Sequence, residues 1–156
     1  MTELLVAILV IGLGALGAAG LQLASSKNTR SALEGTAAVI FAQDMAERLR
    51  ANPEGGYAGV ANGTPPAGFV DCLGANCTPA ELASFDVTVW KCSLGRWLAD
   101  GACREARVAG ALPPEEQQPG LPMGDGAIDW GANGEFTVSV TWHGTGQRRV
   151  ALPGRR

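Results

Sequence analysis

The feature that most constrains the fold of this chain is an uninterrupted apolar stretch close to its start. Between Leu4 and Leu23, the only residues that are not aliphatic are glycines and Gln22. As a helix, these twenty residues span roughly 30 Å at about 1.5 Å each, which is the thickness of the hydrocarbon core of a bilayer. The stretch therefore predicts a membrane-spanning helix. A cleavable secretory signal is the alternative, disfavoured because the only charge before the stretch is the acidic Glu3.

The helix is predicted to continue from the apolar stretch into water. A polar patch at residues 25–30 precedes an amphipathic pattern of apolar residues at helical spacing, namely Leu33, Ala37, Ile40, Phe41, Met45 and Leu49. The helix should end near Asn52, because the residue before a proline is displaced from the helical region. We therefore expect a single helix of about fifty residues, far longer than the usual helix of about a dozen.

Small residues give the apolar helix a surface on which another helix can approach closely. Four glycines, Gly12, Gly14, Gly17 and Gly20, alternate with alanines there. Glycine and alanine at such positions favour helix–helix packing in membranes. The alternative explanation is that glycine is simply more common in membrane helices than in soluble ones.

Composition excludes several classes of function. The hydrophobic content of 46% against 17% charged residues predicts a packed core, and the formal net charge of -3 argues against a nucleic-acid partner. The chain has a single histidine, His143, which leaves little material for a histidine-rich metal site or a catalytic triad. We expect no enzyme activity, no metal and no cofactor, and we interpret His143 as a turn residue.

Three stretches together resemble a known family. They are TELLVAILVIGLGALGAAGLQL at residues 2–23, AQDMAERLRANPEGGY at residues 42–57 and ASFDVTVWKCSLGRWLADG at residues 83–101. Together they are similar to the type IV pilus minor pilins of the PilV family, also called type IV pilus modification proteins. The pseudopilins of type II secretion share only the first stretch, so the middle one favours the pilus.

The resemblance implies a pilin-like α+β fold, in which a long N-terminal helix packs on a small C-terminal antiparallel sheet and a second helix lies in the disulfide-containing middle region. It implies a transmembrane or filament-core helix at residues 1–24 and a soluble head at residues 25–156. Within that head we expect half of the long helix at 25–52, a loop and the second helix at 53–122, and the sheet at 123–156.

The implied function is a minor pilin that is incorporated in the type IV pilus or primes its assembly. The chain would lie in the bacterial inner membrane with its head in the periplasm, and later in the extracellular pilus. Its partners would be other minor pilins, the major pilin, inner-membrane lipid and the pilus assembly machinery. Three alternatives are a type II secretion pseudopilin, a membrane-tethered adhesin or ligand-binding module, and an anchored periplasmic enzyme.

Glu3 aligns with a glutamate that the family places fifth in the mature chain. There it is held to pair with the N-terminal amine of a neighbouring subunit, which implies an assembly role for Glu3. The alternative is a residue at headgroup level on the membrane surface. Family members carry a basic leader ending in glycine, and then an aromatic residue, so we expect the leader and the first two mature residues upstream of Met1.

A second helix is predicted from Thr78 to Gly101. Thr78, Pro79 and Glu81 have the spacing of a capping box with proline in the first turn. Apolar residues follow at three- and four-residue intervals, namely Leu82, Phe85, Val89, Trp90, Leu94, Trp97 and Leu98, and Gly101 is placed to end the helix. A strand through Phe85, Val87 and Val89 is the alternative.

Four cysteines, Cys72, Cys77, Cys92 and Cys103, allow three disulfide pairings. A head outside the cytoplasm would lie in an oxidising compartment. If residues 78–100 are helical, roughly 22 Å separates Cys77 from Cys92, well beyond the Cα distance of about 7 Å that a disulfide tolerates. We therefore expect two local bridges, Cys72 with Cys77 and Cys92 with Cys103. The spacings contain no CxxC pair, so zinc is not expected.

The last part of the chain predicts a three-stranded antiparallel meander. Its strands are expected at 128–130, 136–142 and 148–152, with turns at 131–134 and at 143–146. Phe136, Val138, Val140 and Trp142 would form its apolar face. We expect the long helix to cover that face through Leu33, Ile40, Phe41 and Met45, and we expect an extended loop at 57–70 and a proline-rich spacer at 112–122.

Overall fold

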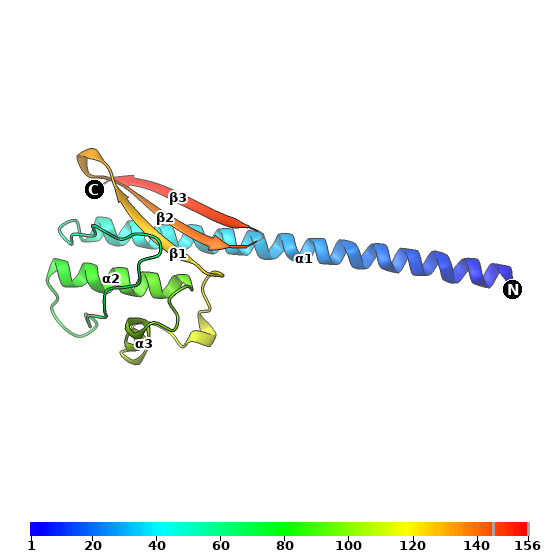
Figure 1. Ribbon diagram of the computed structural model, residues 1–156, viewed down its shortest axis with the longest axis horizontal. Helices are drawn as coiled ribbons and strands as arrows, with labels where there is room; N and C mark the ends of the chain where they lie inside the picture. Colours follow the sequence, from blue (N-terminus) through cyan, green and yellow to red (C-terminus); the bar gives the residue numbers. More distant parts are fainter. Residues whose placement is uncertain (145, 156) are drawn as a thin grey trace. The chain divides into compact units, whose positions relative to one another are not determined.

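The computed structural model describes residues 1–144 and 146–155 of the chain. Its elements in order are α1 (Thr2–Ala51), α2 (Pro79–Leu94), α3 (Gly101–Val108), a short 3-10 turn η1 (Glu115–Gln117), β1 (Asp125–Trp130), a second 3-10 turn η2 (Ala132–Gly134), β2 (Glu135–His143) and β3 (Gln147–Arg155) (Figure 1). The long apolar N-terminal helix, the small antiparallel sheet and the extra helices confirm the expected α+β fold class. The chain divides into two units, residues 1–34 and residues 35–156, which are described separately.

The long helix α1 ends where the sequence predicts. Its last residue is Ala51, and the backbone N–H of Asn52 still donates to the carbonyl oxygen of Arg48 at 3.0 Å. Pro53 follows directly, so the helix cannot continue. α1 contains 50 residues.

The second helix, α2, begins as predicted, because Thr78 and Glu81 form a capping box. The Glu81 backbone N–H donates to the Thr78 hydroxyl, and the Thr78 backbone N–H donates to the Glu81 carboxylate at 2.8 Å. The Thr78 hydroxyl also donates to the Glu81 carboxylate at 2.8 Å, and the two hydrogen bonds that Thr78 donates to this carboxylate lower the pKa of Glu81, since they favour its charged form. The alternative strand is wrong, because Phe85, Val87 and Val89 all lie within α2.

The predicted end of this helix at Gly101 is also wrong, because α2 ends at Leu94. Gly95 adopts a left-handed conformation with φ of 118°, and a Cβ there would collide with the carbonyl oxygen of Leu121. The Leu121 backbone N–H donates to the carbonyl oxygen of Leu94 at 2.7 Å, which fixes this close approach. Gly101 instead opens α3, whose N-cap is Asp100.

The sheet is the predicted antiparallel meander with strand order β1-β2-β3. The first turn lies at η2, where Asn133 and Gly134 both have positive φ, of 57° and 76°. Val138 lies opposite Ile128 on β1 and Leu152 on β3, so apolar residues of all three strands face the same side. Thr145 of the predicted second turn lies outside the described residues.

The loop at residues 57–70 follows the outer edge of β1. The Ile128 backbone N–H donates to the carbonyl oxygen of Val60 at 2.8 Å, and the Trp130 indole N–H donates to the carbonyl oxygen of Tyr57 at 3.2 Å. The loop therefore covers the backbone edge that β1 would otherwise leave exposed.

The apolar face of the sheet is buried, as predicted, with Phe136, Val138, Val140 and Trp142 each at most 4% exposed. The predicted cover is partly wrong, because Leu33 and Ile40 are 66% and 58% exposed. Smaller residues of α1 fill the core instead, namely Ala38, Ala42 and Ala46, together with Met45 and Leu49. Phe41 is partly buried against this cluster.

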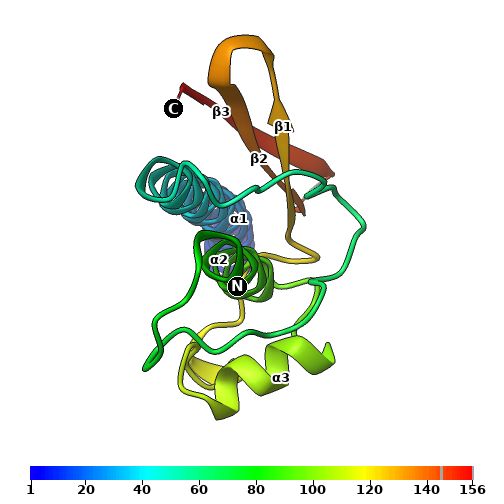
Figure 2. The same ribbon diagram turned by 90° about the vertical axis from the view of Figure 1, so that its left-hand side faces the viewer.

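Alanine suits this helix face because a third layer must fit beside it. α2 lies alongside the C-terminal part of α1, under the sheet, and α3 lies on the far side of α2 (Figure 2). Trp90 of α2 donates its indole N–H to the carbonyl oxygen of Phe41 at 2.9 Å, and its ring lies where a Cβ at Gly126 would clash. The large ring takes the volume that larger side chains on α1 would otherwise fill.

Truncation on the two faces of β2 should have unequal effects. Val138→Ala removes two methyl groups from a fully buried site and should lower the free energy of unfolding by about 2 kcal/mol. Ser139→Ala is the matched control. Ser139 is equally buried, but its hydroxyl has no hydrogen-bond partner among the described residues, so the effect should stay within about 0.5 kcal/mol. Urea unfolding of the full chain in detergent measures both values, and equal losses would contradict the packing described.

Candidate functional site

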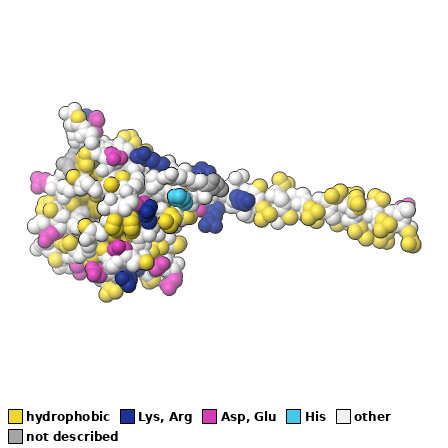
Figure 3. Space-filling view, viewed as in Figure 1, with side chains coloured by type: hydrophobic (Ala, Val, Ile, Leu, Met, Phe, Trp, Pro, Cys, Tyr) yellow, Lys and Arg dark blue, Asp and Glu magenta, His cyan; other side chains and the backbone are white. Residues whose placement is uncertain are grey.

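The first unit, residues 1–34, presents an apolar surface that the chain itself does not cover. Eleven large aliphatic side chains between Leu4 and Leu23 are each at least 60% exposed. Figure 3 shows hydrophobic side chains along this part of α1. Within the described residues, α1 is the helix that is long and apolar enough to cross a membrane, by length and composition. Such a surface requires lipid or other helices around it.

The four glycines predicted to pack against other helices lie on this uncovered surface. Apart from neighbouring residues and nearby backbone of the same helix, a Cβ added at Gly12, Gly14, Gly17 or Gly20 would meet no atom of the described residues within 4 Å. Each glycine in a helix interior costs about 1 kcal/mol relative to alanine, and the described residues show no close contact at these positions that offsets that cost. Gly14, Gly17 and Gly20 are three residues apart and form one line on the helix surface, whereas Gly12 lies on another side.

Glu3 lies in the first turn of α1, and its side chain is exposed. A carboxylate at this position interacts favourably with the partial positive charge of the helix N-terminus. Glu3 and the glycines are therefore on one uncovered element, separated along it by the large aliphatic residues.

The second unit contains a group of polar contacts at the end of α1, which we call the exit clamp: Arg48, Asn52, Tyr57 and Asp86. The Arg48 guanidinium donates to one Asp86 oxygen at 2.8 Å, and the Tyr57 hydroxyl donates to the other at 2.7 Å. The Asn52 side-chain amide donates to Tyr57 at 3.2 Å and to the carbonyl oxygen of Pro79 at 2.8 Å. The exit clamp thus joins the end of α1 to both the start and the middle of α2.

Burial and hydrogen bonding set the protonation states in the exit clamp. Burial, with the hydrogen bond to Asp86, raises the pKa of Tyr57 far above its ordinary value, so its hydroxyl stays a donor. Burial by itself would lower the pKa of Arg48, but hydrogen bonds to Asp86 and Asp44 raise it overall. Asp86 is 5% exposed, and these two donors supply the hydrogen bonds that its buried carboxylate needs.

Gly55 leaves the space that the side chains of the exit clamp need. A Cβ at this position would overlap the Asn52 side chain and would come within 2.9 Å of the Ala83 Cβ. Arg48, Asn52, Gly55 and Tyr57 all belong to the sequence stretch at 42–57, so that stretch has a structural explanation: it holds the two helices together. Asp86 is not recognisable from the sequence as their partner, because a single acidic residue in an apolar helix does not show what it binds.

A second buried ion pair joins α2 to β1. Lys91 and Asp125 have side chains only 2% exposed, and the Lys91 ammonium lies 3.1 Å from the Asp125 carboxylate. The same ammonium donates to the carbonyl oxygens of Ala61 and Thr64, at 2.7 and 2.6 Å. Burial lowers the pKa of Lys91, and the charge of Asp125 opposes that shift. Sequence analysis missed this pair as well.

An open cavity of about 290 Å³ lies between the 55–67 loop and α2. Its lining includes Tyr57, Thr88 and Lys91, but the hydroxyl of Thr88 and the ammonium of Lys91 already bind backbone carbonyls. Among residues 1–144 and 146–155, no group of three or more His, Cys, Asp or Glu side chains could hold a metal ion. His143 is exposed at the end of β2, and its backbone N–H donates to the carbonyl oxygen of Pro122.

Both disulfides have the pairing expected from the sequence. Cys72 is bonded to Cys77 just before α2, and Cys92 of α2 is bonded to Cys103 of α3. Cys92 and Cys103 are fully buried beside Val89 and Leu112. The second bridge therefore stabilises the packing of α3 against α2.

Comparison with known protein families gives a match within the chain. A family model described as Tt1218-like, type IV pilin Tt1218, matches residues 20–88. The match begins within the apolar stretch, ends in α2 and contains every residue of the exit clamp. No curated protein and no solved structure matches the chain. The family match, which covers less than half of the chain, supports a type IV pilin, and the α+β architecture fits a pilin-like fold.

Removing Asp86 should weaken the exit clamp far more than removing Asp44. Both carboxylates bind Arg48, but Asp86 is buried whereas the Asp44 side chain is 46% exposed. Asp86→Ala removes the carboxylate that accepts from the buried Tyr57 hydroxyl and from one Arg48 N–H group, and should lower the free energy of unfolding by about 2 to 3 kcal/mol. Asp44→Ala should change it by about 0.5 kcal/mol or less. Denaturant unfolding compares them, and equal effects would show that the ion pair does not hold α1 to α2.

Proposed function

We propose that this chain is a minor pilin of the PilV family, which enters the type IV pilus or primes its assembly through helix packing and subunit contacts. The observation that carries the proposal is the uncovered apolar surface between Leu4 and Leu23. The match to a type IV pilin model supports a pilin subunit role. Its chemistry is assembly rather than catalysis.

In this proposal, α1 exchanges one apolar environment for another. Before assembly, lipid of the inner membrane covers residues 4–23, and in the pilus neighbouring pilin helices cover them. Lipid chains are as apolar as leucine side chains, so the exchange gains little from hydrophobic burial alone. Close packing must supply the driving force, and the glycines, for which this chain has no internal use, allow backbones to approach.

Glu3 makes the charged contact when the helix moves from lipid into the pilus. A carboxylate that enters apolar surroundings costs several kcal/mol unless it is paired. Pairing with the N-terminal amine of a neighbouring subunit neutralises both groups as the helix leaves the lipid. Specific contact at Glu3 would also fix the axial position of one helix against the next.

The two disulfides and the apolar helix support a membrane-anchored head outside the cytoplasm. Disulfides form and persist outside the cytoplasm. We therefore place the 25–156 head in the periplasm, anchored in the inner membrane by the 1–24 helix, with other minor pilins, the major pilin and the assembly machinery as partners. The stretch at 42–57 favours the pilus over type II secretion within this proposal.

Co-purification tests the function directly. In cells that assemble type IV pili, the chain should be recovered in sheared pili together with other minor pilins. Recovery with the type II secretion apparatus instead would identify a pseudopilin. A head that binds a ligand or surface alone, without any pilin partner, would favour a tethered binding module.

Neutralising Glu3 should block assembly without affecting the anchor. Glu3→Gln leaves a neighbour's amine without its counter-charge, and we expect recovery in sheared pili to fall at least about tenfold while the amount in the membrane stays constant. Glu47→Gln is the control, since Glu47 is an exposed carboxylate later in the same helix. Immunoblots of pilus and membrane fractions measure both, and undiminished recovery of Glu3→Gln would refute the assembly role of Glu3.

A further inference from the structure

The two disulfides lie in contrasting environments. Cys92 and Cys103 are 0% exposed, whereas Cys72 and Cys77 are both partly exposed. Reduction of a disulfide requires a thiolate to reach one of its sulfur atoms. In the folded chain, a reductant can therefore approach the Cys72–Cys77 bridge and is excluded from the Cys92–Cys103 bridge.

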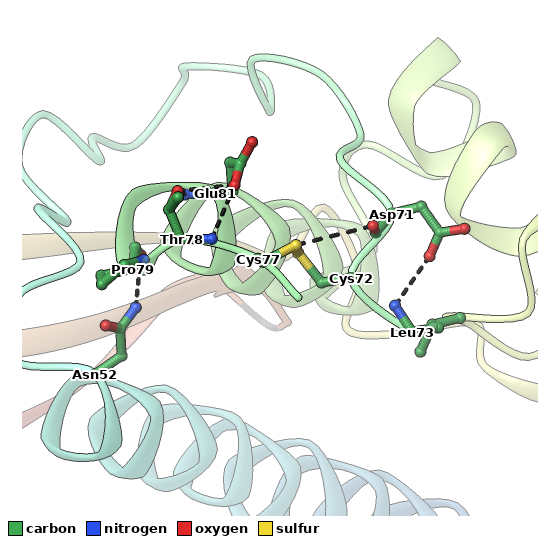
Figure 4. The surroundings of a disulfide bond; sticks show 8 residues. All are labelled: Asn52, Asp71, Cys72, Leu73, Cys77, Thr78, Pro79 and Glu81. Carbon is green, nitrogen blue, oxygen red and sulfur yellow. Dashed lines mark hydrogen bonds between the residues drawn. A yellow bond between two sulfur atoms is a disulfide. The ribbon is translucent and has the colours of Figure 1, made fainter. Parts of the chain in front are cut away.

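The Cys72–Cys77 bridge closes a loop that contributes little to the core. The residues between the two cysteines are all exposed, with Leu73 at 55%. The contacts that hold the loop are local: the Leu73 backbone N–H donates to the Asp71 carboxylate at 3.0 Å, and the Cys77 sulfur lies 3.9 Å from the Asp71 carbonyl oxygen (Figure 4).

The chain on both sides of this loop is held without the bridge. Before it, the Thr88 hydroxyl donates to the carbonyl oxygen of Gly68 at 2.7 Å, and the Phe69 ring lies 5.9 Å from the Phe85 ring. After it, the capping box of Thr78 and Glu81 fixes the start of α2. Asn52 also donates to the carbonyl oxygen of Pro79, so the exit clamp reaches the same point (Figure 4).

From these contrasts we propose that Cys72–Cys77 is a redox-sensitive clasp, which a dithiol reductant opens in the folded protein while Cys92–Cys103 stays closed. A thiolate of the dithiol attacks one sulfur of the bridge, forms a mixed disulfide and displaces the other cysteine as a thiolate. The second thiol of the reductant then releases the first cysteine. The reductant becomes a cyclic disulfide, and two electrons and two protons pass to Cys72 and Cys77.

Reduction of the Cys72–Cys77 bridge changes only the segment at residues 70–77. Residues 70–77 lose the covalent constraint that holds Leu73 and Asn76 in a tight loop, while the anchors at Gly68 and Thr78 keep the change from spreading. The surface at residues 70–77 thus depends on the redox poise of the compartment, whereas the α2–α3 packing does not.

Differential alkylation of the full chain in detergent tests this proposal. The folded protein is incubated with dithiothreitol for increasing times, quenched, alkylated and mapped by mass spectrometry. Cys72 and Cys77 should become labelled at least about tenfold faster than Cys92 and Cys103. In urea the rates should converge, because the burial that protects the second bridge is lost. Similar rates in the folded protein, or earlier labelling of Cys92 and Cys103, would overturn the proposal.

Hydrogen exchange tests whether opening is local. In the double variant Cys72→Ser with Cys77→Ser, amide exchange should rise in residues 70–77 and stay unchanged in the part of α2 around Trp90. The matched variant Cys92→Ser with Cys103→Ser should raise exchange across α2 and α3. If the first variant also loses protection around Trp90, the bridge is a staple of the whole unit and not a local clasp.

Discussion

The ion pair between Arg48 and Asp86 is the contact on which the rest of the second unit depends. It fixes α2 against the end of α1 and leaves Trp90 in contact with the carbonyl oxygen of Phe41. Lys91, the residue after Trp90, donates to Asp125 at the start of β1, so the position of α2 also determines where the sheet begins. The partly buried pair Arg48–Asp86 thus positions α2 against α1, and the buried pair Lys91–Asp125 positions the sheet against α2. Each pair is hydrogen-bonded on several sides, which offsets the cost of its burial.

The sequence was sufficient to predict those elements that depend on interactions between residues close together in the chain. The end of α1 at Asn52, the capping box of α2 and the alternation in β2 depend on residues a few positions apart. The end of α2 could not be predicted, because Gly95 is selected by a distant backbone at Leu121. Leu33 and Ile40 were predicted to cover the sheet because hydrophobicity alone favours large side chains. The structure uses alanines there, since Trp90 occupies the space.

The candidate assembly residues illustrate a different limit on what one chain can explain. Glu3 and the four glycines stand out in the sequence because each is costly in an isolated apolar helix. Their surroundings in this chain are open, so a single copy does not contain the contacts that would explain them. The exit clamp shows the opposite situation. Arg48, Asn52 and Tyr57 stood out in the sequence only because the stretch at 42–57 resembles a known family. The fold explains these residues physically, because they hold α1 and α2 together. Asp86 and Asp125 were missed, because their partners lie far away in the sequence.

The eleven exposed aliphatic side chains of the first unit also set a condition on the path that this helix can follow. Burying one such side chain is worth about 1.5 to 3 kcal/mol, so releasing the helix into water costs on the order of 20 kcal/mol. An aqueous intermediate at that free energy is never appreciably populated. The helix can therefore move from one apolar environment to another only if new apolar contacts form while the old ones separate. Such a transfer avoids the free-energy cost of exposing these side chains to water.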